Sequence, residues 1–273
     1  MNTDSLLRWY EQNRRPLPWR FTRDPYALLV SEVMLQQTQA ARVVPFYERF
    51  LESFPDPATL AAASPGAVLA AWSGLGYNRR ALALRAAAGQ IAADGWPADV
   101  LSLQSLPGVG AYTAAAVASF AWDEPVAAVD SNVRRVISRL DGLDRPPRAV
   151  AERAAELLGN HSAARFNQAT MELGATVCTP RRPRCMACPV ADGCRSAGAV
   201  VDPPRRPAGS RPRFEDSDRW VRGRVIAALL AGEAGRGCEG VEPERLERVL
   251  AGLERDGLLG RDTAGNPVLP GLA

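Results

Sequence analysis

The sequence predicts an all-α protein, because apolar residues recur at three- and four-residue spacing along most of its first 195 positions and no run alternates as a strand would. Proline follows a capping residue at three predicted helix starts, after Asp24, Asp56 and Ser64, where it occupies the first turn. The helical segments expected from this spacing are 28–35, 43–54, 68–72, 81–91, 111–120 and 133–140.

The composition changes after the cysteine-rich segment, which predicts a second, smaller domain. Residues 196–216 are rich in proline and arginine, cannot form a core, and are expected to be an extended basic linker. Beyond the linker, residues 220–230 and 243–253 have the pattern of amphipathic helices, and a turn at 264–266 is flanked by short apolar pairs. Helices followed by a hairpin predict a winged-helix-like module over 217–273.

The composition also excludes several classes of protein. No apolar run is long enough to span a bilayer, and the N-terminus lacks a charged start followed by an apolar block, so we expect a cytoplasmic protein without a membrane segment. The net charge of +3 is only mildly basic. All 33 Lys+Arg residues are arginine, so no side-chain amine is available to form a Schiff base.

Four cysteines form the clearest candidate metal site. Cys178, Cys185, Cys188 and Cys194 follow the spacing C-x6-C-x2-C-x5-C in a segment rich in proline and glycine. Such close spacing favours an iron–sulfur cluster, whereas structural zinc more often uses two short cysteine pairs or histidine. The residues alone leave zinc open. Cys238, in the C-terminal module, is expected to be a free thiol.

A glycine-rich turn predicts contact with phosphate. The segment Leu106-Pro107-Gly108-Val109-Gly110 separates two helical segments, and its glycines let backbone N–H groups approach a phosphate at the start of the following helix. This is the arrangement of a helix-hairpin-helix motif, although an ordinary interhelical turn explains the segment about as well. Such a contact would position a duplex without reading its bases.

Two carboxylates interrupt largely apolar surroundings, Glu32 within SEVMLQQT and Asp130 within VDSNV. A carboxylate there is costly unless it is paired or functional. Glu32 could be a satisfied buried acid, and Asp130 could cap the helix that follows it, with or without a catalytic role.

Together these motifs resemble the helix-hairpin-helix DNA glycosylase superfamily and, within it, the adenine glycosylases of the MutY type. The resemblance covers roughly the first 195 residues and rests on LPWR (17–20), SEVMLQQTQ (31–39), WSGLGY (72–77), LPGVGAYTAAAV (106–117), VDSNVRRV (129–136), NQA (167–169), ELGA (172–175) and the cysteines. It implies a helical barrel lobe over 24–129, a second lobe over 1–23 and 130–195, and one 4Fe-4S cluster on the four cysteines.

The resemblance also implies an activity and roles for single residues. Members excise adenine mispaired with 8-oxoguanine or guanine from double-stranded DNA, and we expect a monomer acting on nucleoid DNA. Glu32 and Asp130 match the two catalytic acids, with Tyr112 and Asn132 as neighbours that hold the site. Residues matching positions that contact DNA are Arg20, Leu35, Gln36, Gln37, Tyr77, Gly108, Val109 and Gly110.

Three other activities compete with this interpretation. A bifunctional glycosylase and AP lyase like endonuclease III carries lysine where this chain has Tyr112, and mismatch thymine glycosylases also carry tyrosine there. A non-catalytic iron–sulfur DNA-binding protein would keep the scaffold alone, which the intact acids argue against.

The chain departs from the family at Ser131 and Asn78. Residues 217–273 are also too few for the C-terminal domain with which many members grip the oxidised guanine.

Overall fold

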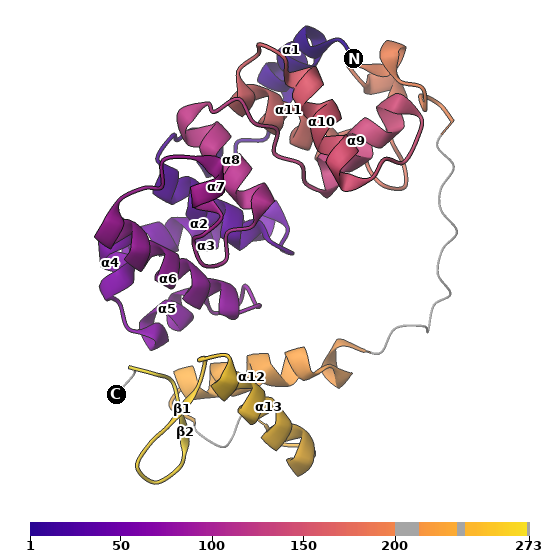
Figure 1. Cartoon of the computed structure of the whole chain (residues 1–273). Helices are drawn as coiled ribbons and strands as arrows, with labels where there is room; N and C mark the ends of the chain where they lie inside the picture. The colour runs from indigo at the N-terminus through magenta and orange to yellow at the C-terminus, as the bar shows by residue number, and fades with distance from the viewer. Residues whose placement is uncertain (200–212, 234–237, 272–273) are drawn as a thin grey trace. The chain divides into compact units, whose positions relative to one another are not determined.

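The computed structural model describes residues 1–199, 213–233 and 238–271, and most of these residues are helical (Figure 1). Strands in these ranges are limited to one short hairpin, so the predicted all-α class is confirmed. The helices are α1 Thr3–Asn13, α2 Pro25–Leu35, α3 Ala40–Ser53, α4 Pro57–Ala62, α5 Pro65–Trp72, α6 Arg79–Asp94, α7 Val100–Leu103, α8 Ala111–Trp122, α9 Ser131–Asp141, α10 Pro147–Leu158, α11 Ala163–Thr176, α12 Asp218–Leu230 and α13 Pro243–Arg255.

The predicted capping residues do start helices. Asp56 accepts a hydrogen bond from the N–H of Thr59 at 2.7 Å, and Ser64 accepts one from Ala67 at 3.2 Å, with proline at the first helical position in both cases. Each such cap satisfies an N–H that the helix itself leaves unpaired, which typically stabilises a helix by about 1 kcal/mol. The apolar spacing predicted no segment for α1, for the short helix α7, or for α10 and α11.

The chain divides into two compact units. The first comprises Met1–Glu32, Pro97–Ser105 and Val109–Arg205, and the second comprises Val33–Trp96, Leu106–Gly108 and Arg206–Ala273. Both units recruit segments far apart in the chain. The boundaries of these units differ from those of the expected lobes, one over 24–129 and the other over 1–23 and 130–195. Those lobe boundaries therefore stay a prediction.

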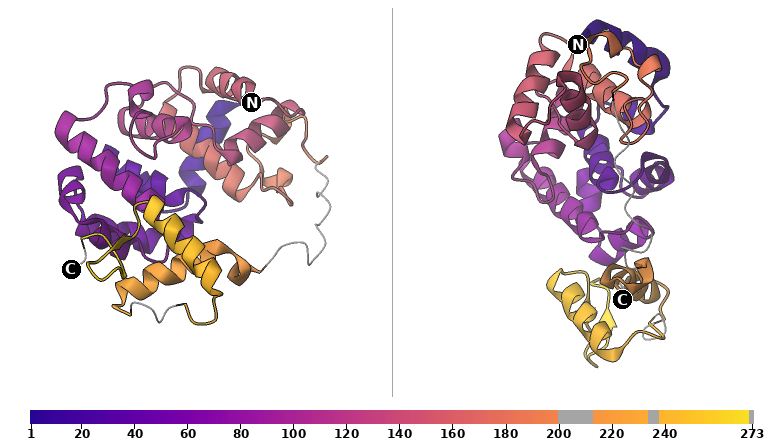
Figure 2. Two further views of the ribbon diagram at one scale, coloured as in Figure 1. Left: turned by 60° about the horizontal axis from the view of Figure 1, so that its bottom comes forward. Right: turned by 90° about the vertical axis from the view of Figure 1, so that its right-hand side faces the viewer.

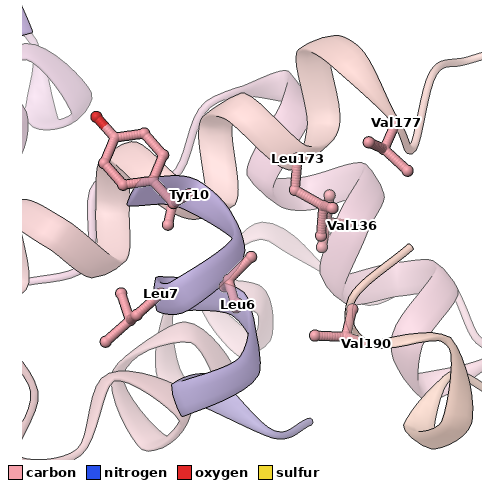
Figure 3. Packing of buried hydrophobic residues seen from close by; sticks show 8 residues of the cluster. Leu6, Leu7, Tyr10, Val136, Leu173, Val177 and Val190 are labelled. Atoms are coloured by element: carbon pink, nitrogen blue, oxygen red, sulfur yellow. The ribbon is translucent and has the colours of Figure 1, made fainter. Parts of the chain in front are cut away.

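The core of the first unit joins α1, α9 and α11 (Figures 1 and 3). Leu6 on α1 and Leu173 on α11 are fully buried there, and Val136 on α9 is nearly so. Each such side chain contributes about 1.5–3 kcal/mol relative to leaving it in water. Val190 packs into the same cluster, so this core anchors the cysteine segment to α1.

The second unit contains α3 to α6 and the C-terminal module. Trp72 and Phe50 are fully buried, with ring centroids 5.8 Å apart in an edge-on arrangement. The module consists of α12 packed against α13 and a hairpin of β1 (Gly260–Arg261) and β2 (Pro267–Val268), in the register Gly260 opposite Val268 (Figure 2). The two helices and the hairpin predicted for 217–273 are therefore confirmed.

The module is fastened to the rest of its unit near the end of the chain. The carbonyl of Pro270 accepts a hydrogen bond of 3.0 Å from the N–H of Gly66 at the start of α5. Most of the predicted linker, 200–212, lies outside the described residues. Among the helices described, none is long and apolar enough to cross a membrane.

Candidate functional site

Glu32 lies near the C-terminal end of α2 and is 4% exposed. Its carboxyl group hydrogen-bonds with the hydroxyl of Tyr112, while its Oε2 atom has no hydrogen-bond partner among the described residues. Burial raises the pKa of Glu32 from its usual 4.5 to about 7; the hydrogen bond from Tyr112 opposes this rise, and the negative charge of Asp130 adds to it. Near neutral pH a substantial fraction of Glu32 therefore keeps its proton, and its unpaired oxygen is free to engage a ligand.

Asp130 is the N-terminal cap of α9 and has the opposite environment. Its Oδ1 atom accepts a hydrogen bond from the N–H of Val133 at 2.7 Å, and its Oδ2 atom accepts one from Nδ2 of Asn132 at 2.7 Å. Both donors, and the positive end of the helix dipole, stabilise a negative carboxylate at this position. The capping role predicted for Asp130 is therefore observed, and both of its carboxylate oxygens accept hydrogen bonds, whereas Oε2 of Glu32 has no partner among the described residues.

Tyr112 lies in the first turn of α8, hydrogen-bonds with Glu32 and interacts electrostatically with Asp130. Burial, together with the negative charges of Glu32 and Asp130, raises the pKa of its phenol well above the usual 10, so the hydroxyl stays protonated. The sulfur of Met171 lies 3.8 Å from that hydroxyl. A phenol that keeps its proton can hold the carboxyl group of Glu32 in place but cannot act as a nucleophile.

A hydrogen-bonded chain runs from Asp130 to the cysteine segment through Asn132 and Arg135. The Arg135 guanidinium donates to Oδ1 of Asn132 at 2.8 Å, to the carbonyl of Gly174 at 2.7 Å and to the carbonyl of Cys178 at 2.8 Å. The sequence analysis did not single out Arg135, because two of its partners, Gly174 and Cys178, are 39 and 43 positions away in the chain.

Gly174 allows α11 to approach Asn132. A Cβ atom added there would lie 2.6 Å from Cβ of Asn132, closer than real Cβ contacts come. The ELGA motif contains this glycine, but only the fold shows what it contacts.

The four predicted cysteines line one pocket, together with Arg139. No group of cysteine, histidine or acidic side chains in the described residues is arranged to hold a single metal ion. Four cysteines lining one pocket fit a cubane cluster, in which each iron takes one thiolate. Arg139 donates to the sulfur of Cys178 at 3.4 Å. Cys238 lies in the module, in the other unit, and is a free thiol as expected.

Two loops of the second unit carry the residues expected to insert into DNA, and we call residues 36–39 and 73–78 the insertion loops. Gln37 and Tyr77 have φ values of 58° and 50°, a left-handed conformation that non-glycine residues seldom adopt and that costs on the order of 1–3 kcal/mol. Both are exposed, whereas Leu35 and Gln36 are half-buried. Such backbone strain is commonly found at functional sites.

Arg80, which the sequence did not single out, holds both insertion loops. Its guanidinium donates to the carbonyls of Val33 at 2.9 Å and Gly76 at 3.0 Å, and it lies 5.3 Å from the ring centroid of Tyr77. It also donates to the carbonyls of Met34 and Gln36 at the end of α2. Burial lowers the pKa of Arg80 to about 10, so it remains a cation at neutral pH.

The glycine-rich turn has the geometry that its sequence predicted. Gly108 has a φ of 78°, and a Cβ atom there would lie 2.9 Å from that of Ala83 on α6. Gly110 precedes α8 without any side-chain cap, so the first N–H groups of that helix are left for another acceptor. Leu106 and Val109 are buried and anchor the turn.

Arg20 lies in a different environment from that expected of a DNA contact. Its side chain is 7% exposed and pairs with the fully buried Glu172, which also pairs with Arg15 at 2.9 Å. Burial alone would raise the pKa of Glu172, but hydrogen bonds from Arg15 and Arg20 lower it to about 2. The proposed DNA contact of Arg20 stays a prediction, and its burial counts against it.

Comparison with known proteins gives matches over nearly the whole chain. Residues 30–160 match the model for an HhH-GPD superfamily base excision DNA repair protein, and residues 178–194 match the iron–sulfur binding domain of endonuclease III. An adenine DNA glycosylase of Mycobacterium tuberculosis is 42% identical over 98% of this chain and 93% of its own length. The human adenine DNA glycosylase is 42% identical over 72% of this chain, which spans 39% of that longer protein.

Solved structures agree in fold. A thermostable thymine-DNA glycosylase superposes with a TM-score of 0.68 at 30% identity, covering 72% of this chain and 95% of its own. A non-covalent endonuclease III–DNA complex superposes with a TM-score of 0.63 at 24% identity, covering 72% and 94%. The family match over 178–194 decides between the two metals: the cofactor is one 4Fe-4S cluster and not zinc.

Proposed function

We propose that this chain, which belongs to the adenine DNA glycosylases of the helix-hairpin-helix base excision repair superfamily, excises adenine mispaired with 8-oxoguanine or guanine. The observation that carries the proposal is the pair of carboxyl groups in the first unit. Glu32 is buried with a pKa raised to about 7, while each carboxylate oxygen of Asp130 accepts a hydrogen bond. Pairs of acids in opposite environments are how enzymes assign proton donor and anion roles.

The chemistry follows from these environments. Adenine stacked in a duplex hides its glycosidic bond, so the nucleotide must first leave the helix, at a cost of a few kcal/mol. Glu32 then donates its proton to the five-membered ring of adenine, the bond to the sugar breaks, and its electron pair leaves with the base. Asp130 stabilises the positive charge that develops on the sugar, and water adds to that carbon and releases a proton, which completes the hydrolysis. Tyr112 holds Glu32 and Asn132 holds Asp130, and the four cysteines hold the cluster.

DNA is bound by several segments in this proposal. Gly108, Val109 and Gly110 bring backbone N–H groups to phosphate, while Gln37 and Tyr77 enter the base stack with Leu35 and Gln36 beside them. The left-handed backbone at both inserting residues and the uncapped start of α8 support these roles. The enzyme would act as a cytoplasmic monomer on the nucleoid. The exposed arginines 181, 182 and 184 in the cysteine segment would widen the phosphate-binding surface.

The competing activities have less support. Lyase chemistry of the endonuclease III type needs an amine, and the sequence has Tyr112 at the matching position and no lysine at all. A thymine glycosylase is the better structural rival, because one superposes on 72% of this chain. The adenine glycosylases are supported by a higher identity that extends through the C-terminal module.

Single-turnover excision on duplexes that pair adenine with 8-oxoguanine, guanine or cytosine tests the proposal. We expect rapid adenine release opposite the first two bases, with strand breakage only after alkali. Glu32→Gln should slow release by about 10²- to 10⁴-fold, the usual contribution of a general acid, while the exposed control Glu48→Gln on α3 should not. Equal rates on all three duplexes would refute the mismatch specificity, and thymine release would favour the rival.

A further inference from the structure

A large groove of the second unit has no role in the proposed chemistry. It has a volume of about 1410 Å³ and is lined on one side by the insertion loops and on the other by α12 of the C-terminal module. Neither family model reaches the module, because their matches end at residue 194. The groove therefore places α12, which neither family model covers, beside Gln37 and Tyr77.

The lining of the groove is strongly cationic. Six arginines line it, against the single carboxylate of Asp256, which is already paired with Arg222 and lies 3.5 Å from Arg79. The other four are Arg42, Arg80, Arg219 and Arg224, and none of them has a carboxylate within 4.0 Å in the part of the chain that the structure describes. Uncompensated cations in a concave surface attract an extended anion.

Aromatic rings hold two of these arginines in place. The Arg219 guanidinium lies 5.0 Å from the ring centroid of Tyr77 and 5.1 Å from that of Phe214, and it donates a hydrogen bond to the hydroxyl of Tyr77. The Arg224 guanidinium lies 4.7 Å from the ring of Trp220. Stacking fixes the orientation of a guanidinium yet leaves most of its N–H groups free. Tyr77 and Phe214 are themselves 42% and 51% exposed, as surfaces that stack on nucleic-acid bases are.

The surface of α12 that faces the groove leaves room for a ligand. Gly223 follows Arg219 by one helical turn and lines the groove, and a Cβ atom added there would meet nothing within 4 Å. Ala227, one turn further, is exposed and also lines the groove. A strand can therefore approach this face closely between Arg219 and Arg224.

We propose that α12 binds the phosphodiester backbone of DNA through Arg219 and Arg224, next to the place where Tyr77 enters the duplex. This rests on the proposed function, in which the ligand of the insertion loops is DNA. Arg219 contacts both Tyr77 and the groove, so insertion of Tyr77 and capture of the adjacent backbone occur at one place. An acidic segment of another protein would also suit the charge, but the exposed rings and the insertion loops favour DNA.

The salt dependence of binding tests this. The full-length holoprotein is titrated with a fluorescent duplex that contains no mispair, at several salt concentrations, so that the result does not depend on excision. Each phosphate contact contributes about 0.9 to the slope of log affinity against log salt. Arg219→Gln and Arg224→Gln should each lower the slope by about 0.9, so the loss of affinity relative to the wild type should be roughly eightfold larger at 0.1 M than at 1 M salt. The matched control is Arg255→Gln on α13, an exposed arginine outside the groove, which should leave the slope unchanged.

Two further measurements separate binding from folding. Arg224→Lys keeps the charge and should restore most of the slope, whereas a purely structural stack on Trp220 would not be restored. In the wild-type protein, duplex should protect Arg224 but not Arg255 from an arginine-modifying dicarbonyl, read by mass spectrometry. Unchanged slopes, or no protection of Arg224, would overturn the proposal and leave α12 as a structural brace or a protein-docking surface. Failure of adenine excision with normal slopes and protection would instead refute the proposed function alone.

Discussion

Glu32→Gln should stabilise the protein in alkaline solution while it destroys the proposed proton donor. The carboxyl group has a pKa of 4.5 when exposed and about 7 when folded. Below pH 4.5 it is protonated in both states, and its ionisation costs nothing. As the pH rises from 4.5 through 7, the unfolded chain releases the proton while the folded chain retains it, so stability is lost. At about 1.4 kcal/mol per pH unit, the full loss is about 3 kcal/mol, reached above pH 7.

Glutamine removes this loss because it carries no charge and has nearly the shape of the protonated acid. Denaturant unfolding of cluster-loaded wild-type protein and Glu32→Gln, at about pH 5 and about pH 8.5, measures the effect. We expect the variant's gain in unfolding free energy to be roughly 2–3 kcal/mol larger at the higher pH. Glu48→Gln, on an exposed face of α3, controls for the loss of one negative charge.

A gain that is the same at both pH values would refute the reasoning, because only ionisation of a buried group produces the pH dependence. A gain at low pH that disappears at high pH would be more serious. It would mean that the folded protein favours the carboxylate and that Glu32 cannot be the proton donor.

Three further predictions concern the surroundings of Asp130. Asp130→Asn should abolish single-turnover excision yet keep the melting temperature within a few degrees, because asparagine caps helices about as well as aspartate; a variant with substantial activity would contradict the anion role. Gly174→Ala should destabilise the protein by about 1–3 kcal/mol in denaturant unfolding and slow excision, because its Cβ overlaps that of Asn132; a neutral effect on both would mean that α11 moves freely. Arg135→Met should lower both the iron content measured after purification and the excision rate, since it loses its bonds to Asn132 and Cys178; full iron with full activity would show that this link is dispensable.

The sequence predicted helices best where local signals were complete. Asp56 and Ser64 act through N–H groups three residues away, so their effect is visible in a few consecutive letters. Helix α11 was missed because Asn167, Thr170 and Glu172 are buried on it and interrupt the apolar stripe. Their partners compensate for that burial: Asn167, for example, hydrogen-bonds with Ser119 at 3.0 Å, and that residue is 48 positions away.

Prediction of the site residues was limited in the same way, to those with a local sequence signal. Glu32, Asp130 and the four cysteines were recognisable because each stands in a distinctive short motif. Arg80 was not, since its hydrogen-bond acceptors are main-chain carbonyls, which any residue offers. Whether a half-buried guanidinium joins two loops depends on where the fold places the carbonyls of residues 33–36 and 76 around Arg80, which no short stretch of sequence shows.

Arg80 also couples the conformations of the two insertion loops. One planar cation holds the last turn of α2 and the segment before Tyr77, so neither loop can change its conformation without disturbing the other. A lysine could replace the charge but not the forked geometry that reaches both sets of carbonyls. Gln37 and Tyr77 would then enter or leave a duplex together. An enzyme that scans undamaged DNA would therefore insert both side chains at a base pair or neither of them.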